Sequence, residues 1–180
     1  LAAAICICSG RLASRLGALK VERDRFPLAA AEFIARHKLT GKMVCTFNWA
    51  QYALAAFGPK EPGQPGILVQ IDGRCRTAYS QAMLDHHFDF LMGEIRPDLR
   101  YRDPQSGPLD PTRVLRDGRP DLVLIWRQQE PSALLMAEKE KQGEWVLLYQ
   151  DSLAQLYGRA SKYDDPTSAY HLPLGKRYIG

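Results

Sequence analysis

Short apolar runs are spaced along the chain and are separated by stretches with helical periodicity. Mainly apolar runs occupy positions 43–47, 67–71 and 122–126, and turn-forming residues lie beside them. Runs of this length and composition predict strands that are buried on both faces of a sheet. The third run is the strongest, because its five large apolar residues lie between a Pro-Asp pair and an arginine.

The intervening segments carry apolar residues at helical spacing together with start and stop signals. They predict helices over residues 27–37, 49–57, 79–95, 111–117 and 131–142. Two further apolar runs, 145–150 and 153–158, are separated only by Asp151-Ser152 and predict a hairpin.

Alternating strands and helices followed by a hairpin predict an α/β fold. We expect an open, mainly parallel mixed sheet of about five strands with helices on both faces and a C-terminal β-hairpin. The chain has 180 residues, of which 46% are hydrophobic, and this suffices for one core. The expected organisation is an N-terminal helical segment (1–25), an α/β domain (26–160) and an extended C-terminal tail (161–180).

The N-terminal segment begins with an unbroken apolar run over residues 1–8. Eight residues are too few to span a bilayer. The run is interpreted either as the last turns of a transmembrane helix that starts upstream, or as part of an amphipathic helix. In the second case one face carries Leu12, Leu16 and Leu19.

Charge and cysteine usage narrow the function classes. The formal net charge is +4, but no aromatic-interleaved basic motif accompanies the arginines, so we expect no nucleic-acid partner. The four cysteines show no CxxC pair or Cys/His spacing for zinc, and we expect neither a metal nor another cofactor. Cys45 and Cys75 end two predicted strands, either within disulfide reach of each other or as two separate thiols.

Polar and aromatic residues follow the first two predicted strands. In parallel sheets ligands bind beyond the carboxyl ends of the strands, so these residues form the candidate ligand-binding site. Carboxylate, guanidinium, amide and aromatic groups together suit a sugar or another polyhydroxylated ligand. The candidate residues are Asn48, Trp49, Tyr52, Asp72, Arg74 and Tyr79.

The same six residues also have an ordinary structural interpretation. Asn48 is a suitable helix cap, Trp49 and Tyr52 suit a core, and Asp72 can pair with Arg74 to shape a turn. The sequence leaves both interpretations open.

A second group of titratable residues lies on the predicted helix 79–95. Asp85, His86, His87 and Asp89 are close enough to share helix faces, but a metal needs a further ligand from elsewhere and no HExxH signature supplies one. We expect a half-buried polar helix edge and no metal site. An acid and base pair of Asp72 with His86 or His87, in a free-standing enzyme, is an alternative.

Four motifs occur in an order that resembles a known class of proteins. They are TFNWxxY (46–52), IDGR (71–74), DLVL (121–124) and WVLLYQD (145–151), followed by YDDPTS (163–168) and LP (172–173). Residues 26–157 resemble the C-terminal extracytoplasmic domain of bacterial multi-spanning membrane proteins related to lipid-phosphate-sugar-dependent glycosyltransferases. The chain departs from that pattern at Ala50 and Gln51, where such proteins often carry glycine.

The resemblance implies a noncatalytic accessory domain that binds the sugar or the acceptor. The catalytic acidic residues of such enzymes lie in loops near membrane-embedded helices, outside this chain, while the parent protein is the glycosyltransferase. The implied partners are a sugar or lipid-linked sugar, and the membrane through upstream helices.

The resemblance also implies a membrane-attached, periplasmic-side location. Arg11 and Arg15, which follow the apolar run, instead favour a cytoplasmic flank. A protein-interaction module that presents residues 98–108 to a partner is the remaining alternative.

Overall fold

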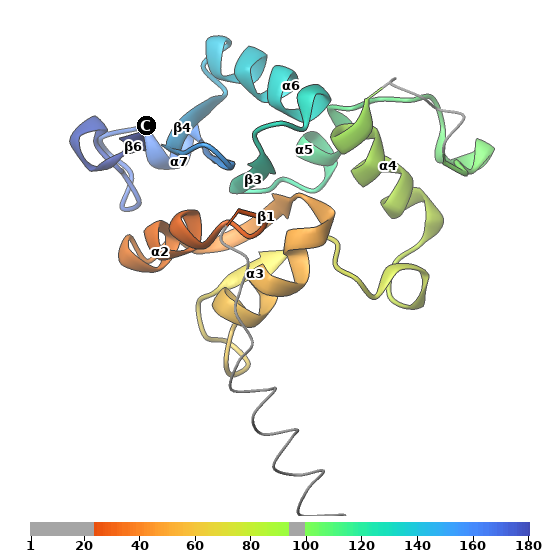
Figure 1. Cartoon of the computed structure of the whole chain (residues 1–180), viewed down its shortest axis with the longest axis horizontal. Helices are drawn as coiled ribbons and strands as arrows, with labels where there is room; N and C mark the ends of the chain where they lie inside the picture. Colours follow the sequence, from red (N-terminus) through yellow and green to blue (C-terminus); the bar gives the residue numbers. More distant parts are fainter. Residues whose placement is uncertain (1–23, 94–99) are drawn as a thin grey trace, which may run out of the picture.

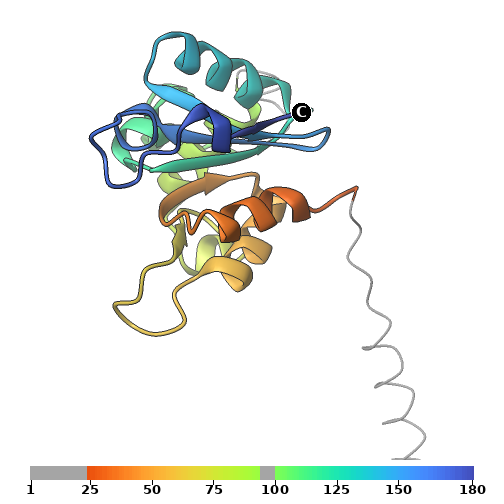
Figure 2. The ribbon, with the colours of Figure 1, turned by 90° about the vertical axis from the view of Figure 1, so that its left-hand side faces the viewer.

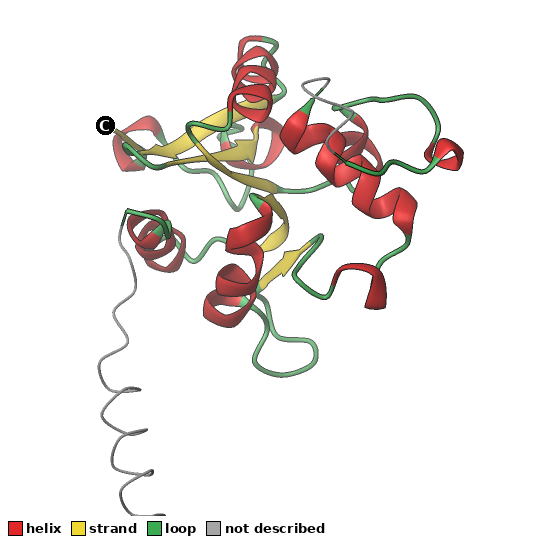
Figure 3. Cartoon of the chain, turned by 45° about the vertical axis from the view of Figure 1, so that its right-hand side comes forward, coloured by secondary structure: helices red, strands yellow, loops and turns green. Residues whose placement is uncertain are grey.

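The computed structural model describes residues 24–93 and 100–180, which form an α/β fold around one six-stranded mixed sheet (Figures 1 and 3). The strand order is β2-β1-β3-β5-β4-β6. The strands are β1 (Gly41–Cys45), β2 (Ile67–Val69), β3 (Leu122–Trp126), β4 (Trp145–Gln150), β5 (Ala154–Arg159) and β6 (Tyr178–Ile179). The predicted α/β class, mixed open sheet and C-terminal hairpin are confirmed.

The sheet has a parallel half and an antiparallel half. β1 lies between β2 and β3 and is parallel to both, with Met43 opposite Val69 on one side and opposite Leu122 on the other. β5 runs antiparallel to β3 and to β4, and β6 pairs in parallel with β4 at the outer edge. The carboxyl ends of β1, β2 and β3 therefore meet at one edge of the sheet, which we call the carboxyl edge.

Helices cover both faces of the sheet, as predicted. One face packs against α2 (Leu28–Arg36), α3 (Ala50–Phe57) and α7 (Ala160–Tyr163), and the other packs against α4 (Gln81–Met92), α5 (Arg113–Asp117) and α6 (Glu130–Lys141). Alternate strand residues supply the two cores: Met43 and Leu122 enter the first, while Val44 and Val123 enter the second. This alternation is the period of two that a strand imposes on its side chains.

β1 ends two residues earlier than predicted, and this changes the start of the next helix. The Thr46 hydroxyl accepts a hydrogen bond from the Trp126 amide at 2.9 Å, and residues Phe47–Trp49 form a 3-10 turn that leads into α3. The turn occupies the place where a helix cap was expected. Asn48 lies inside it and makes no capping hydrogen bond, so the predicted cap is wrong.

The C-terminal segment is more structured than the expected extended tail. Tyr163 and Leu172 are buried in the first core, and the backbone N–H of Leu172 donates to the Tyr163 carbonyl at 2.8 Å. The chain then passes through a 3-10 turn (Leu174–Lys176) and adds β6 to the sheet. Apolar burial at these two positions holds the segment against the domain.

No helix within residues 24–93 and 100–180 has the length and apolar character needed to cross a membrane. The apolar run 1–8, the arginines that follow it, Cys6 and Cys8 lie outside the described residues, as does the predicted helix end at 94–95.

Candidate functional site

The two loops that carry the predicted site residues lie together at the carboxyl edge. A Cβ atom at Gly73 would come within 2.6 Å of the Gln51 amide nitrogen, so the loop after β2 lies against the start of α3. The Asp72 carboxylate also influences the end of β1: burial, together with this nearby charge, raises the pKa of the Cys45 thiol to about 12. The expected convergence of the two loops is confirmed.

Asp72, Arg74 and Tyr79 form one hydrogen-bonded group. Arg74 donates from Nε and Nη2 to the Asp72 carboxylate at 3.0, 3.1 and 2.8 Å, and its backbone N–H adds a further bond at 2.9 Å. Arg74 Nη2 also contacts the Tyr79 hydroxyl at 3.2 Å. The carboxylate is 1% exposed and the guanidinium 61% exposed, so a buried anion holds a cation at the surface.

Hydrogen bonds from the Arg74 side chain lower the pKa of Asp72 to about 2. The carboxylate is therefore ionised at neutral pH and holds no proton to give to a substrate. The Nη1 group of Arg74 donates to no residue in the described part of the chain, and it remains open to a ligand.

Asn48, Trp49 and Tyr52 have different surroundings. Asn48 is exposed at the carboxyl edge. Trp49 is 4% exposed, and its indole N–H donates to the Arg25 carbonyl at 2.8 Å, so most of this side chain serves packing. Tyr52 is half-buried, with its ring 5.9 Å from that of Phe26.

Two neighbouring cavities open at this edge and share Phe88 and Met92 of α4. The first, of about 570 Å³, is mainly apolar and is bounded by the ends of β1 and β3 and the start of α6. The second, of about 590 Å³, lies between the loop after β2 and α4. We name them the apolar cavity and the cationic cavity.

The cationic cavity takes its name from three arginines in its lining, Arg74, Arg76 and Arg100. Arg74 is paired with Asp72, and Arg100 with Asp89. Arg76 is exposed and forms no ion pair with any described residue; its guanidinium lies 5.8 Å from the centre of the Tyr101 ring. Within residues 24–93 and 100–180, one positive charge in this cavity is therefore without an ion-pair partner.

A third cavity, of about 460 Å³, adjoins the apolar cavity and shares Thr46, Asn48 and Trp126 with it. Its wall includes Asp24, the first described residue. Figure 2 shows the start of α2 and the tip of the β4-β5 hairpin on the same side of the molecule. The chain thus comes into the domain at the carboxyl edge, beside the candidate site.

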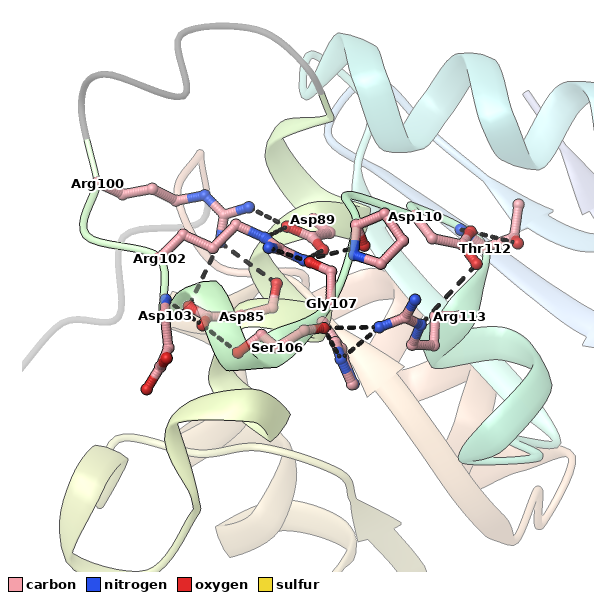
Figure 4. Close-up of polar contacts among 12 residues, drawn as sticks. Asp85, Asp89, Arg100, Arg102, Asp103, Ser106, Gly107, Asp110, Thr112 and Arg113 are labelled. Carbon is pink, nitrogen blue, oxygen red and sulfur yellow. Dashed lines mark hydrogen bonds and ion pairs between the residues drawn. The ribbon is translucent and has the colours of Figure 1, made fainter.

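The acidic residues of α4 are engaged by arginines (Figure 4). Asp89 is fully buried and accepts hydrogen bonds from Arg100 and, at 3.1 and 3.0 Å, from Arg102. Arg102 Nη1 continues to the Gly107 carbonyl at 2.5 Å. This network fastens the segment 100–108 to α4.

Asp85 completes the network. Its carboxylate accepts from the Ser106 hydroxyl at 2.6 Å, the Asp103 amide at 2.9 Å and Gln81 at 2.8 Å. Burial by itself raises the pKa of Asp85, but these hydrogen bonds outweigh burial and leave the pKa below its ordinary value. Asp85 is 1% exposed, so the expected half-buried helix edge is wrong: the carboxylates are buried because they anchor a loop.

The two histidines of α4 differ from each other. His86 Nε2 lies 2.9 Å from Arg113 Nη1 and 3.2 Å from the Ser106 carbonyl. His87 is fully buried near Phe47, neither ring nitrogen has a hydrogen-bond partner among the described residues, and burial lowers its pKa to about 4. Within the described residues neither histidine is hydrogen-bonded to Asp72, and no cluster of three metal-ligating side chains forms.

Both described cysteines are free thiols, Cys45 buried and Cys75 partly exposed.

The structure also adds residues that the sequence interpretation missed: Arg76, Phe88, Arg100 and Tyr101 line the cationic cavity. The sequence shows the two arginines at 100 and 102, but not that their carboxylate partner is Asp89 on α4.

Comparisons with family models, with curated proteins and with solved structures find no match to this chain.

Proposed function

We propose that this chain is a noncatalytic accessory domain that binds a sugar or lipid-linked sugar at its carboxyl edge, within a membrane glycosyltransferase-like protein. The observation that carries the proposal is the Asp72, Arg74 and Tyr79 group beside a cavity in which Arg76 forms no ion pair with a described residue. The glycosyltransferase context and the periplasmic-side location rest on the four-motif resemblance.

The chemistry of the edge suits binding better than proton transfer. A guanidinium held by a buried carboxylate keeps a fixed direction, and its free Nη1 can donate to a hydroxyl or phosphate oxygen. Arg76 adds charge for a phosphate, and Tyr101, which is 65% exposed, offers a ring face. Asp72 is already engaged by Arg74, so its role is to orient the arginine.

The apolar cavity supports an amphiphilic ligand. Phe88 and Met92 line both cavities. A ligand whose charged end lies near Arg76 in the cationic cavity can therefore place an apolar portion in the apolar cavity. The chain reaches the domain beside the same edge, through Asp24. Upstream membrane helices would therefore bring this edge close to the bilayer.

The proposal is tested by isothermal titration with three probes: a hexose, a short-chain prenyl phosphate, and a prenyl phosphate carrying that hexose. The decisive variant is Arg76→Gln, because Arg76 is exposed and pairs with no carboxylate in the described part of the chain, so its replacement should leave the fold intact. Arg36→Gln, on the exposed end of α2, removes the same charge elsewhere.

We expect saturable binding of the prenyl-phosphate hexose. Arg76→Gln should weaken that binding by about fivefold, the loss expected for one solvent-accessible ion pair of about 1 kcal/mol. Arg36→Gln should bind like the unmodified chain. Absence of binding by all three probes, or equal weakening by both variants, would refute the proposal.

A further inference from the structure

A cavity of about 650 Å³ lies at the opposite edge of the sheet from the candidate site. It is bounded by α5, by the residues just before β3, by the first residue of β4 and by the last residue of β5. Four basic and two acidic side chains line it: Arg116, Arg119, Lys139, Arg159, Asp121 and Glu144. We name it the amino-edge cavity, because β3 begins there.

Two backbone carbonyls and an aromatic ring hold the guanidinium of Arg159 in this cavity. Its guanidinium lies 4.8 Å from the ring centre of Trp145, which is 2% exposed, and it donates from Nε to the Pro120 carbonyl and from Nη2 to the Leu115 carbonyl, both at 3.0 Å. Within the described residues it meets no carboxylate, and its Nη1 group makes no hydrogen bond. The Trp145 ring and the two carbonyls thus hold the Arg159 guanidinium in place, and its Nη1 group is left to donate to a ligand.

The two carboxylates of the cavity are already engaged. Asp121 forms an ion pair with Lys162 at 3.0 Å and accepts the backbone N–H of Lys42 at 3.0 Å. Glu144 pairs with Lys139 at 2.9 Å. Neither carboxylate balances Arg159, so its charge is uncompensated by the cavity's own acids.

Arg119 adds a second uncompensated cation. It is exposed, and its side chain forms no ion pair or hydrogen bond in the described part of the chain. Its backbone φ of 43° lies in the left-handed region that side chains other than Asn, Asp and Gly rarely adopt. No contact with a described residue gives the Arg119 side chain a structural role in this cavity, which Arg159 also lines.

We propose that the amino-edge cavity binds a phosphate-type dianion. A planar guanidinium with an open Nη1 group presents paired donors that match phosphate oxygens, and a second guanidinium at the rim adds charge without blocking the approach. The site lies at the other edge of the sheet from the sugar site and does not depend on the proposed function. The phosphate belongs either to a soluble phosphorylated molecule or to a lipid headgroup.

Arg159 also has a structural role, because its bonds to the Leu115 and Pro120 carbonyls stabilise the end of α5. The main test therefore uses Arg119→Asn, which removes the rim charge and suits a positive φ. Lys38→Asn is the matched control: Lys38 is also exposed, has a φ of 51° and lies outside the cavity. Both variants should fold, so a difference between them reports on the cavity.

Pyrophosphate and inorganic phosphate are titrated into the chain by calorimetry at low ionic strength, where exposed charges are least screened. We expect saturable pyrophosphate binding that Arg119→Asn weakens by about fivefold, as for loss of one accessible ion pair. Lys38→Asn should leave it unchanged. Arg159→Lys, checked for folding by thermal unfolding, should weaken binding more than Arg119→Asn, because lysine keeps the charge but loses the fork.

A second arm identifies the source of the phosphate. Sedimentation with phosphatidylcholine vesicles containing phosphatidic acid is compared with the pyrophosphate titration. Vesicle binding that depends on Arg119 would show that the phosphate belongs to a lipid headgroup. Pyrophosphate binding in the absence of vesicle binding would show that the ligand is a soluble phosphorylated molecule. If neither probe binds, or if Arg119→Asn and Lys38→Asn respond equally, the proposal is wrong.

Discussion

Acid should destabilise this domain before its carboxylates begin to titrate, because of His87. The imidazole is fully buried without a hydrogen-bond partner among the described residues, and burial lowers its pKa to about 4 from an ordinary value of 6.5. When the pH falls below 6.5, the unfolded chain binds a proton at His87 and the folded chain does not. Stability is therefore lost as pH decreases, until the folded state also binds the proton near pH 4.

The magnitude follows from the two pKa values. Each pKa unit corresponds to about 1.4 kcal/mol, so the complete loss is about 3 kcal/mol, of which about 2 kcal/mol is reached at pH 5. This is a large part of the stability of an ordinary domain. Asp72 adds little between pH 7 and pH 5, because a carboxyl with the ordinary pKa of 3.8 is ionised there in the unfolded chain as well as in the folded chain.

Urea unfolding at pH 7 and at pH 5 measures the effect. The unmodified chain should be about 2 kcal/mol less stable at pH 5. His87→Phe, which keeps a ring beside Phe47 and Phe88, should remove most of that difference. His37→Gln is the control and should retain it, because that ring is only partly buried. Equal stability of the unmodified chain at both pH values, or an undiminished loss in His87→Phe, would refute the reasoning.

Three further predictions concern the buried polar groups. Asp89→Asn should lower the free energy of unfolding by about 3 to 5 kcal/mol, because it removes a fully buried carboxylate and leaves the partly buried Arg102 without its charge partner; a loss below about 1 kcal/mol in urea unfolding would show that the network does not hold the loop. Thr46→Val should cost about 1 to 3 kcal/mol by leaving the Trp126 amide unpaired, measured by tryptophan fluorescence during unfolding, and a neutral result would contradict it. The Asp72 carboxyl carbon should titrate in NMR with a midpoint near pH 2, whereas a midpoint near 4 would mean that Arg74 does not hold it in solution.

Much of the fold was predictable because it depends on local pattern. The run at 122–126 predicts a strand buried on both faces, because every position in it is apolar. β3 has the same bounds. The bounds of β1 were less predictable. They depend on the Thr46 hydroxyl meeting the Trp126 amide, a contact between residues 80 positions apart. The addition of β6 likewise depends on the pairing of Tyr178 with Tyr149, which local sequence patterns do not predict.

The candidate site was predictable where neighbouring residues form it. Asp72 and Arg74 are two residues apart, and the topological rule for parallel strands was enough to place their loop at the same end of the sheet as the start of α3. The roles of the α4 carboxylates were not predictable, because Asp85 and Asp89 are satisfied by groups 11 to 21 residues away that return over the helix. From the sequence alone, a dense acidic group on a helix is therefore predicted to be exposed, because the positions of its cationic partners are unknown.

The most direct test of the sugar-binding account is chemical-shift mapping with the prenyl-phosphate hexose on the isotope-labelled chain. The account predicts that the largest saturable changes fall on the backbone amides of Gly73, Arg74 and Arg76, with Arg36 and Lys38 unaffected. Changes confined to another face of the domain, or none at ligand saturation, would contradict it.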